Sequence, residues 1–217
     1  MAAVVPAAER NKGPIWAVLD SALPAAATGL PDSEAAPVRI LEVATGTGQH
    51  AAHFASQRAD LLVQPTDITL MQRVSVAAHA EACGVSAHVL PLRQLDVLAG
   101  WPAELEASEP FDAAVCINML HISPRECAEA LFGVCARGLR SGGFLMTYGP
   151  YRVDGFLCQS NKDFERGYLK AQDERYGIWE LRDLERLAEG HGFRLEATHE
   201  MPANNLTLIW RFTAEGG

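Results

Sequence analysis

The fold is decided by the stretch Val38-Arg39-Ile40-Leu41-Glu42-Val43-Ala44-Thr45-Gly46-Thr47-Gly48-Gln49-His50. Its first half is a short apolar run, which is typical of a parallel strand covered on both faces. Gly46 and Gly48 then permit a tight turn and the close approach of a ligand. A helix expected to begin near Gln49 would direct its unpaired N–H groups at that ligand. The spacing Gly46-x-Gly48-x-x-Ala51 also fits the dinucleotide fingerprint, so the turn predicts a cofactor without identifying it.

Strand and helix patterns alternate after this turn. Apolar runs predict strands at 61–67, 85–90, 111–118 and 144–148, and helical spacing predicts helices at 49–58, 70–83 and 102–107. Ser123-Pro124-Arg125-Glu126 has the pattern of a capping box that begins a further helix. Regular alternation of this kind predicts an α/β fold, a doubly wound, mostly parallel Rossmann-like sheet with right-handed crossovers.

The two ends of the chain depart from this alternation. Residues 6–13 are polar and basic, and Pro14 suits the first position of a helix, so a short basic arm and a helix of about two to three turns are expected. Residues 24–37 carry three prolines without periodicity, which indicates a mobile surface connection. Beyond 150, helices are expected at 161–170 and around 181–187. Strands at 193–200 and 205–212 are joined so closely that they must form an antiparallel hairpin.

One domain is therefore expected over residues 1–217, with residues 1–30 as an arm and helix able to act as a lid. The net charge of −9 argues against a nucleic-acid partner and favours a small-molecule substrate. No stretch approaches the ~20 apolar residues of a membrane span, and no signal peptide is evident, so a cytoplasmic location is expected. The five cysteines lack C-x-x-C spacing and are interpreted as small buried hydrophobes, with no metal site. The oligomeric state is left open.

Three acids follow the predicted strands: Glu42, Asp67 and Asp96. In an open parallel sheet the ligand lies at the carboxyl ends of the strands, so these acids should converge. Carboxylates repel a pyrophosphate but suit a ligand with ribose hydroxyls, an ammonium group and a sulfonium. Asp67 alone would serve NAD equally well, since it stands about 20 residues beyond the glycines. Glu42 and Asp96 favour S-adenosylmethionine.

The pattern Glu42-x-Ala44-x-Gly46-x-Gly48 resembles the first motif of the class I methyltransferases, with alanine where the first glycine usually stands. Alanine fits there if its φ is ordinary. The resemblance implies that Asp67 holds the ribose hydroxyls and that Ile68 packs on the adenine. The remaining cofactor-binding residues that it implies are Glu42, Ala44, Thr45, Gly46 and Gly48 in the turn, Asp96 and Val97 at the adenine edge, and Asn118 near the methionine part.

A closer resemblance covers nearly the whole chain. It rests on 8–12 (AERNK), 46–50 (GTGQH), 64–67 (QPTD), 118–124 (NMLHISP), 148–151 (YGPY), 154–155 (DG), 160–161 (SN) and 201–205 (MPANN). Together these motifs resemble the methyltransferase-like 26 family, a group long catalogued as a domain of unknown function. The chain departs from that pattern at 164–168 and 177–180 and carries the long 24–37 loop. Those regions are expected to cap the site, so substrate choice should differ from that of relatives.

Methyl transfer from a sulfonium is an in-line displacement, so holding the nucleophile against the methyl group supplies much of the catalysis. His121 is the candidate base or substrate ligand, with a structural loop histidine as the alternative. Tyr148 and Tyr151 are candidates for orienting the acceptor or facing the sulfonium, or else form an aromatic wall.

Candidate substrate-binding residues also stand near both ends of the chain. Arg10, Asn11 and Lys12 would hold a carboxylate of the cofactor or substrate, or form a solvated arm. Asn204 would contact the substrate, or shape the hairpin turn. His50 and His53 are interpreted as packed or exposed residues of the first helix after the glycines.

Three functions are compatible with these residues. The first is methyl transfer from S-adenosylmethionine to a small molecule. The second is a NAD(P)-dependent oxidoreductase, which leaves Glu42, Asp96 and the terminal hairpin unexplained. The third is a non-catalytic cofactor-binding or scaffold protein, since a fold does not fix a function.

Overall fold

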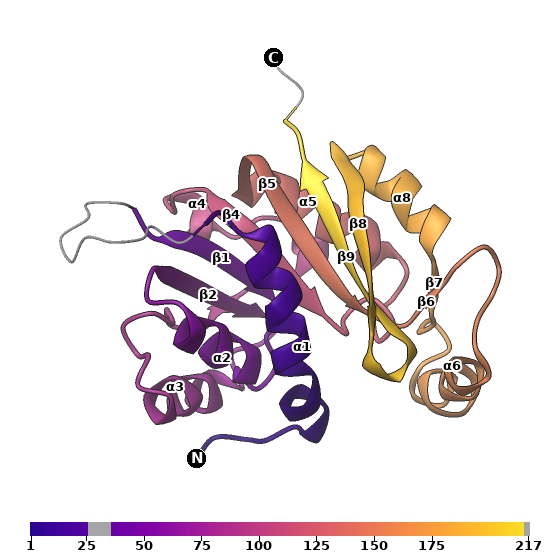
Figure 1. Cartoon of the computed structure of the whole chain (residues 1–217), viewed down its shortest axis with the longest axis horizontal. Coiled ribbons are helices and arrows are strands. Elements are labelled where there is room, and N and C mark those ends of the chain that lie inside the picture. Colours follow the sequence, from indigo (N-terminus) through magenta and orange to yellow (C-terminus); the bar gives the residue numbers. More distant parts are fainter. Residues whose placement is uncertain (26–35, 215–217) are drawn as a thin grey trace.

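The computed structural model describes residues 1–25 and 36–214 (Figure 1). Its main sheet has seven strands in the order β3-β2-β1-β4-β5-β9-β8. β1 to β5 are parallel to one another, and β9 is antiparallel to both β5 and β8. The predicted doubly wound sheet with an antiparallel C-terminal hairpin is confirmed. The strands of this sheet are β1 (Val38–Val43), β2 (Leu61–Asp67), β3 (Arg93–Gln94), β4 (Phe111–Ile117), β5 (Leu139–Gly149), β8 (Phe193–Met201) and β9 (Asn205–Phe212).

Helices cover the two faces of this sheet (Figure 1). They are α1 (Pro6–Ala22), α2 (Gln49–Gln57), α3 (Arg73–Ala82), α4 (Ala103–Glu106), α5 (Glu126–Gly138), α6 (Gln159–Phe164), α7 (Lys170–Gln172) and α8 (Leu181–Glu189). A second, two-stranded sheet pairs β6 (Tyr151–Arg152) with β7 (Trp179–Glu180). Short helical turns occur at η1 (Val97–Ala99) and η3 (Pro202–Asn204), and η2 (Glu165–Leu169) is a π-helix.

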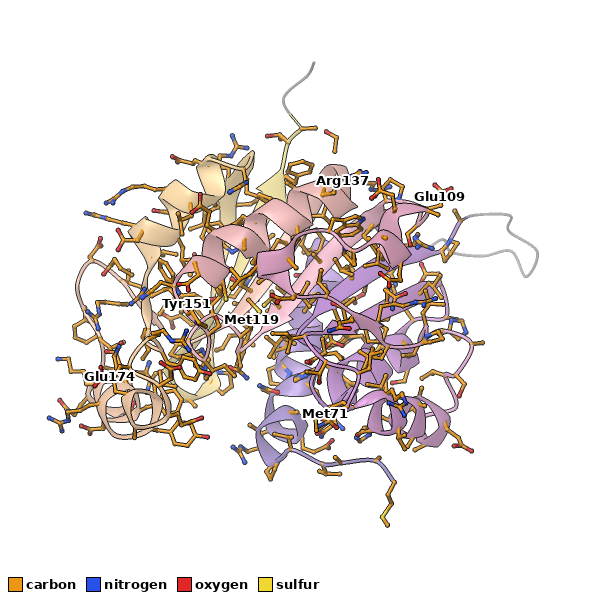
Figure 2. All side chains as sticks on the ribbon, turned by 180° about the vertical axis from the view of Figure 1, so that it is seen from behind. Met71, Glu109, Met119, Arg137, Tyr151 and Glu174 are labelled. Atoms are coloured by element: carbon orange, nitrogen blue, oxygen red, sulfur yellow. The ribbon has the colours of Figure 1, made fainter. Side chains whose placement is uncertain are left out.

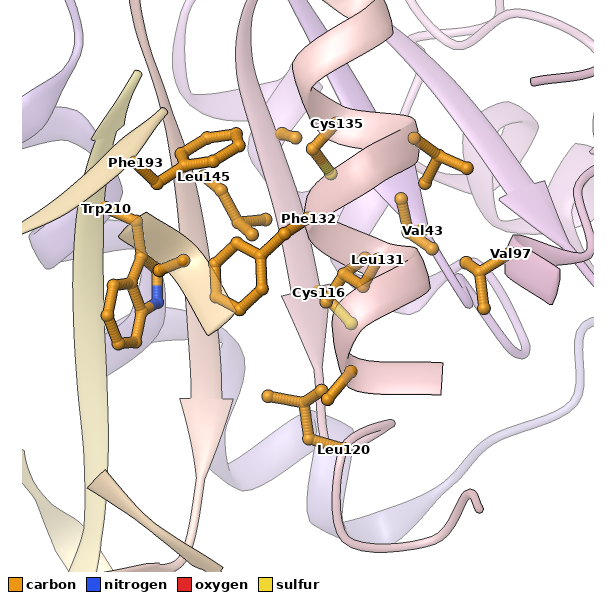
Figure 3. Packing of buried hydrophobic residues seen from close by; sticks show 14 of the residues in the cluster. Val43, Val97, Cys116, Leu120, Leu131, Phe132, Cys135, Leu145, Phe193 and Trp210 are labelled. Atoms are coloured by element: carbon orange, nitrogen blue, oxygen red, sulfur yellow. The ribbon is translucent and has the colours of Figure 1, made fainter. Parts of the chain in front are cut away.

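Two hydrophobic cores hold the helices to the sheet. β1 serves both, because Ile40 faces the α1–α3 side whereas Leu41 and Val43 face the α5 side. All three side chains are almost fully buried, as expected for a strand covered on both faces. On the α5 side, Phe132 makes an edge-to-face contact with Trp210, with ring centroids 5.4 Å apart (Figure 3). Strand β1 therefore fixes the turn that follows it between two packed layers.

The N-terminal helix is longer than the sequence indicated. α1 begins at Pro6, and Pro14 lies inside the helix. The prediction of a basic arm over residues 6–13 is therefore wrong. Ala8, Ile15 and Leu19 form one buried stripe, and a Lys12–Glu9 ion pair one turn apart supports the exposed side. Burial of this stripe outweighs the hydrogen bond that Pro14 cannot donate.

The predicted third strand, 85–90, is also wrong. This segment contacts the sheet through a single bridge between Val63 and Val89, and the paired strand is the later, shorter β3. Leu90 N donates to Val63 O at 2.8 Å, but the next residue is Pro91, which has no N–H to continue a ladder.

The expected capping box does not form. α5 begins at Glu126, its N-cap is Arg125, and no side chain caps the first turn. Cys127 N donates instead to Pro124 O at 3.0 Å, a main-chain turn that replaces the side-chain cap. Cys116, Cys127 and Cys135 are buried, as predicted, whereas Cys83 is exposed.

The remaining predicted elements agree with the structure to within a few residues, and the segment 161–170 is helical across α6, η2 and α7. Residues 26–35 of the expected surface connection lie outside the described part of the chain. Among the described residues, no helix has the length and apolar content needed to cross a membrane.

Candidate functional site

The carboxyl ends of β1, β2, β4 and β5 meet at one edge of the sheet, where Figure 1 shows the start of α2 and the β8–β9 turn. The turn Ala44–Gly48, here called the cofactor turn, follows β1 at this edge. Asp67 ends β2, and Asn118 to Ile122 form the loop after β4. Figure 2 shows Met119, of that loop, between the two halves of the molecule.

Two N–H groups of the cofactor turn donate hydrogen bonds to β2. Gly46 N donates to Asp67 Oδ2 at 2.9 Å, and Thr45 N donates to Thr66 O at 2.8 Å. Gly48 has φ +86°, and a Cβ there would lie 2.7 Å from Val76 Cα on α3. Only glycine fits that position, since the obstacle is backbone. The structure thus brings Asp67 onto the turn.

Ala44 does not meet the condition under which an alanine fits this position without strain. Its φ is +57°, in the left-handed region. A Cβ in this region crowds the following carbonyl, at a cost of roughly 1–2 kcal/mol. The position therefore has the conformation that glycine adopts freely, and the hydrogen bonds around it hold an alanine there.

Glu42 lies beneath the turn and is almost completely buried. Burial raises its pKa to about 8, Thr45 opposes the shift by donating its hydroxyl to the carboxylate, and the charge of Asp67 adds to it. A cation placed over the turn would relieve this cost, because opposite charge favours the ionised form. The pair of acids thus suits a positively charged ligand.

The three residues predicted to contact the adenine differ in exposure and in their hydrogen bonds. Ile68 is 57% exposed just beyond β2, so its apolar side chain is available to pack on a ring. Asp96 caps η1 by accepting a hydrogen bond from Leu98 N at 3.0 Å. Val97 is buried in the α5-side core, so only its main chain can meet a ligand.

On the other side of the edge, His121 is buried between two elements. A Cβ at Gly149 would lie 3.0 Å from its Nδ1, so the glycine at the end of β5 lets the ring pack closely against the strand. On the opposite side Phe164 packs edge-to-face against it at 5.8 Å. Burial lowers the pKa of His121 to about 4, so the imidazole is neutral at neutral pH. Asn118, before it, has φ +64° and donates its N–H to Tyr148 O at 2.8 Å.

Tyr148 is oriented by Asn205, the first residue of β9, which was not predicted as a site residue. Asn205 Nδ2 lies 3.0 Å from Tyr148 Oη and 3.2 Å from Pro202 O. A carbonyl oxygen only accepts, so the amide nitrogen must face it and also donates to the tyrosine oxygen. Tyr148 is buried, and within the described residues its Oη has no hydrogen-bond partner other than Asn205.

Tyr151 is buried in the α5-side core. Its hydroxyl donates to Thr147 Oγ1 at 2.9 Å, and burial raises its pKa. Of the two predicted roles, the aromatic wall agrees better with this position, and a contact with the substrate stays a prediction. The sequence pattern could not show which face of the chain Tyr151 takes.

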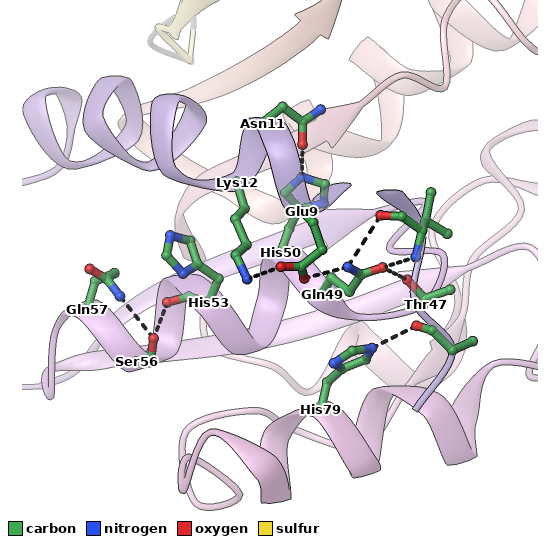
Figure 4. Close-up of polar contacts among 12 residues, drawn as sticks. Glu9, Asn11, Lys12, Thr47, Gln49, His50, His53, Ser56, Gln57 and His79 are labelled. Atoms are coloured by element: carbon green, nitrogen blue, oxygen red, sulfur yellow. Dashed lines mark hydrogen bonds and ion pairs between the residues drawn. The ribbon is translucent and has the colours of Figure 1, made fainter. Parts of the chain in front are cut away.

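The predicted N-terminal residues are mostly occupied within the protein (Figure 4). Lys12 Nζ pairs with Glu9 at 2.7 Å, and Asn11 Oδ1 lies 2.9 Å from His50 Nε2. Burial lowers the pKa of His50 to about 4. Arg10 is exposed.

Asn204 contacts the residues around the start of α6. Its Nδ2 donates to Ser160 Oγ at 3.1 Å, and its main-chain oxygen accepts from Asn161 Nδ2 at 3.0 Å. Asn204 thus connects the β8–β9 turn to α6.

For residues 150–180, here called the cap, the sequence predicted the fewest of the observed elements. Asp154 and Gly155, both at positive φ, form the tip of a small hairpin closed by Val153 and Phe156. The π-helix η2 follows α6, and Phe164 stacks on Tyr168 at 5.3 Å. Residues 164–168 were expected to cap the site, but no spacing rule predicts the π-turn that begins after Phe164.

Two further features bear on the site. A hollow of about 670 Å³ lies on the outer side of α3 against residues 86–91, and none of the predicted site residues lines it. Within the described part of the chain, no group of three or more His, Cys, Asp or Glu side chains is placed to hold a metal ion.

The parallel sheet, the glycine turn and the antiparallel final strands make up the Rossmann-like fold of class I methyltransferases. Residues 2–212 match the family model described as "Protein of unknown function (DUF938)", and the chain belongs to that family.

Solved structures share this fold at low identity. An O-methyltransferase family protein from Burkholderia thailandensis superposes with a TM-score of 0.73 at 15% identity over 95% of this chain and 57% of that one. An O-methyltransferase family 2 protein from Planctomyces limnophilus, in complex with apigenin, gives 0.69 at 18% identity over 94% and 60%. Magnesium protoporphyrin IX methyltransferase from Synechocystis, with bound SAH, gives 0.64 at 15% identity over 94% and 83%. The chain spans less than two thirds of the first two.

Proposed function

We propose that this protein is an S-adenosylmethionine-dependent methyltransferase that acts on a small-molecule acceptor. The observation that carries the proposal is the convergence of Glu42 and Asp67 on one glycine turn, with Glu42 buried and its pKa raised. Two carboxylates at this point disfavour a pyrophosphate and favour a cationic, ribose-bearing cofactor. The fold shared with methyltransferases supports the same assignment.

The residues of the site fit this cofactor. Asp67 would accept the ribose hydroxyls, Ile68 would pack on the adenine, and Asn118 would lie near the methionine part. When bound, S-adenosylmethionine supplies an electrophilic methyl group on a sulfonium. Thr45, Gly46 and Gly48 would bring main chain against it, which the lack of room for a Cβ at Gly48 supports. Glu42 would be ionised by the charge above it.

His121 and Tyr148 are proposed to act on the acceptor. The neutral imidazole of His121 is able to take a proton from an acceptor hydroxyl while the methyl carbon exchanges its bond to sulfur for a bond to that oxygen. The phenol proton of Tyr148, fixed by Asn205, would hold a second oxygen of the acceptor. Phe164 covers the ring of His121, so the cap must shift before an acceptor can contact the imidazole.

The quoted motifs support a relationship to methyltransferase-like 26 proteins. Two of the similar structures, one a complex with apigenin and one a magnesium protoporphyrin IX methyltransferase, support a small-molecule class of acceptor. The net charge of −9 supports a function without nucleic-acid partners. A cytoplasmic location without a membrane partner is proposed from the sequence, which has no apolar stretch of ~20 residues and no evident signal peptide.

A thermal-shift titration tests the proposal. With S-adenosylhomocysteine at 100 times its Kd, the folded state gains about 2.7 kcal/mol, which raises Tm by several degrees. NAD should leave Tm unchanged. A shift with NAD and none with S-adenosylhomocysteine would overturn the proposal in favour of an oxidoreductase, and no shift with either would favour a scaffold.

A further inference from the structure

A segment before α1 lies across the ends of two helices. Residues Met1–Val5, here called the strap, run beside the first residues of α2 and along α3 (Figures 1 and 4). Ala3 is bonded through both its main-chain groups to α3, by N–H donation to Ser75 Oγ at 2.9 Å and by its oxygen lying 2.8 Å from His79 Nε2. Val4 between the bonded residues is 62% exposed. The strap is thus attached by alternate residues, as a strand would be.

Val5 is held by a single side chain, that of Gln49. Val5 N donates to Gln49 Oε1 at 2.6 Å, and Gln49 Nε2 lies 3.4 Å from Val5 O and 2.7 Å from Glu9 Oε1. Thr47 Oγ1 donates to the same Gln49 oxygen at 2.9 Å. The buried amide therefore uses both donors and both lone pairs of its oxygen, and it joins the strap and α1 to the cofactor turn.

Ser75 makes a second, parallel connection. Its hydroxyl donates to Thr47 O at 3.0 Å while it accepts from Ala3 N. Thr47 stands between Gly46 and Gly48, which lack the Cβ that restrains most residues. The carbonyl and the hydroxyl of Thr47 are thus both hydrogen-bonded to residues that also bind the strap.

We propose that the strap is a working part of the cofactor site, and that Gln49 and Ser75 are positioning residues that hold the cofactor turn in its binding conformation. This rests on the proposed function. A turn with two glycines samples other conformations when its restraints are removed. Since apparent affinity falls with the fraction of competent molecules, loss of the restraints weakens cofactor binding without removing any cofactor contact. Cofactor binding must in return stabilise the strap.

The test uses S-adenosylhomocysteine as the probe. Gln49→Ala removes the shared amide and should weaken the calorimetric Kd about tenfold, the effect of one to two hydrogen bonds. Ser75→Ala removes a smaller group and should weaken it about threefold. Gln57→Ala is the matched control: it removes the same residue type from the same helix, where the side chain bonds only Ser56, and should bind like the parent.

Two readouts separate positioning from mere folding. In hydrogen exchange, S-adenosylhomocysteine should slow exchange of the Ala3 and Val5 amides in the parent and in Gln57→Ala, but not in Gln49→Ala. Gln49→Glu should bind worse than the parent because it faces Glu9, and the exchanged pair Glu9→Gln with Gln49→Glu should recover part of the affinity.

The outcomes are distinguishable. If the parent does not bind S-adenosylhomocysteine, the proposed function fails and the inference with it. If the parent binds, but Gln49→Ala and Ser75→Ala bind equally well and the strap amides show no ligand-dependent protection, the inference alone is overturned. A lower Tm of Gln49→Ala with unchanged affinity also overturns it.

Discussion

The cofactor turn and the cap lie at the same edge of the sheet, but different kinds of atoms surround a glycine in each. In the turn the obstacle beside a glycine is backbone, because a Cβ on Gly48 would meet Val76 Cα at 2.7 Å. In the cap the obstacles are the ends of long side chains. A Cβ on Gly177 would meet Glu165 Oε1 at 3.1 Å, and Glu165 itself pairs with Arg152 at 3.0 Å.

The difference separates a rigid part from an adjustable one. Backbone cannot retreat from a new atom, whereas the tip of a glutamate or lysine can rotate away at little cost. The turn is thus suited to one invariant ligand, and the cap, with its π-helix and stacked aromatic rings, can change its lining without disturbing the sheet. Four predictions test this contrast, from the largest expected effect to the smallest.

Gly48→Ala should destabilise the protein by about 4 kcal/mol, from left-handed strain and overpacking against α3. Gly177→Ala, in the cap, should cost less than about 1 kcal/mol, since only side-chain ends must move. Free energies of unfolding from denaturant titration measure both. Equal losses in the two variants would contradict the contrast.

Asp67→Ala should weaken S-adenosylhomocysteine about 100-fold, because it removes both the proposed ribose contact and the acceptor of Gly46 N. Asp67→Asn keeps an acceptor for Gly46 and should lose only about tenfold. A cap carboxylate offers the control, and Glu165→Gln should stay within about twofold of the parent by calorimetry. An unchanged Kd for Asp67→Ala would place the cofactor elsewhere.

The two buried histidines, one beside each region, should make the protein sensitive to acid. The pKa values of His50 and His121 are lowered to about 4, so each is neutral when folded but takes a proton when unfolded below about pH 6.5. The free energy of unfolding is therefore highest above pH 6.5 with respect to each histidine. It falls as pH drops from 6.5 toward 4, because only the unfolded state binds the proton there. At pH 5 the loss should be about 2 kcal/mol per histidine.

Glu42 titrates in the opposite sense, since its raised pKa of about 8 makes stability fall as pH rises from about 4.5 to 8. Comparing His50→Gln and His121→Gln with the parent removes this background. Each variant should show a flatter decline in unfolding free energy between pH 6.5 and 5. A decline as steep as the parent's in either variant would refute the assignment for that histidine.

Ala44→Gly should stabilise the protein by about 1 kcal/mol, because it relieves the left-handed strain and recovers more than the added entropy of the unfolded chain. Thermal unfolding at constant pH measures the gain. Ala136→Gly, inside α5, is the matched control and should destabilise by about 1 kcal/mol. A loss of stability in Ala44→Gly would show that the alanine makes contacts worth more than its strain.

The sequence predicted best where one rule acted alone. β1, β2 and the final hairpin follow from apolar runs bounded by glycine, proline or a short link, and the glycine spacing located the cofactor turn. Residues 85–90 also form an apolar run, but Pro91 and the geometry of the sheet edge displaced the strand to β3. Whether Ala44 would be strained was left open, because spacing carries no information about φ.

The parts that escaped prediction depend on contacts between distant segments. The sequence predicted Gln49 as the first residue of a helix. It could not predict the partners Val5 and Glu9, because they lie more than 35 positions away. Asn205 similarly acquires its role from Tyr148, on another strand. Tyr151 looked like a neighbour of Tyr148 in function, yet it enters the opposite core.

The place of β9 in the sheet has a consequence for biosynthesis. β9 is the latest strand in the chain, yet it lies between β5 and β8 rather than at an edge. While residues 205–212 are still in the ribosome, β5 has an unpaired edge and β8 has no partner in the sheet. The nascent chain must therefore keep an adhesive strand edge exposed until the last eight-residue strand emerges. Chaperone demand during translation should consequently persist until residues 205–212 have emerged.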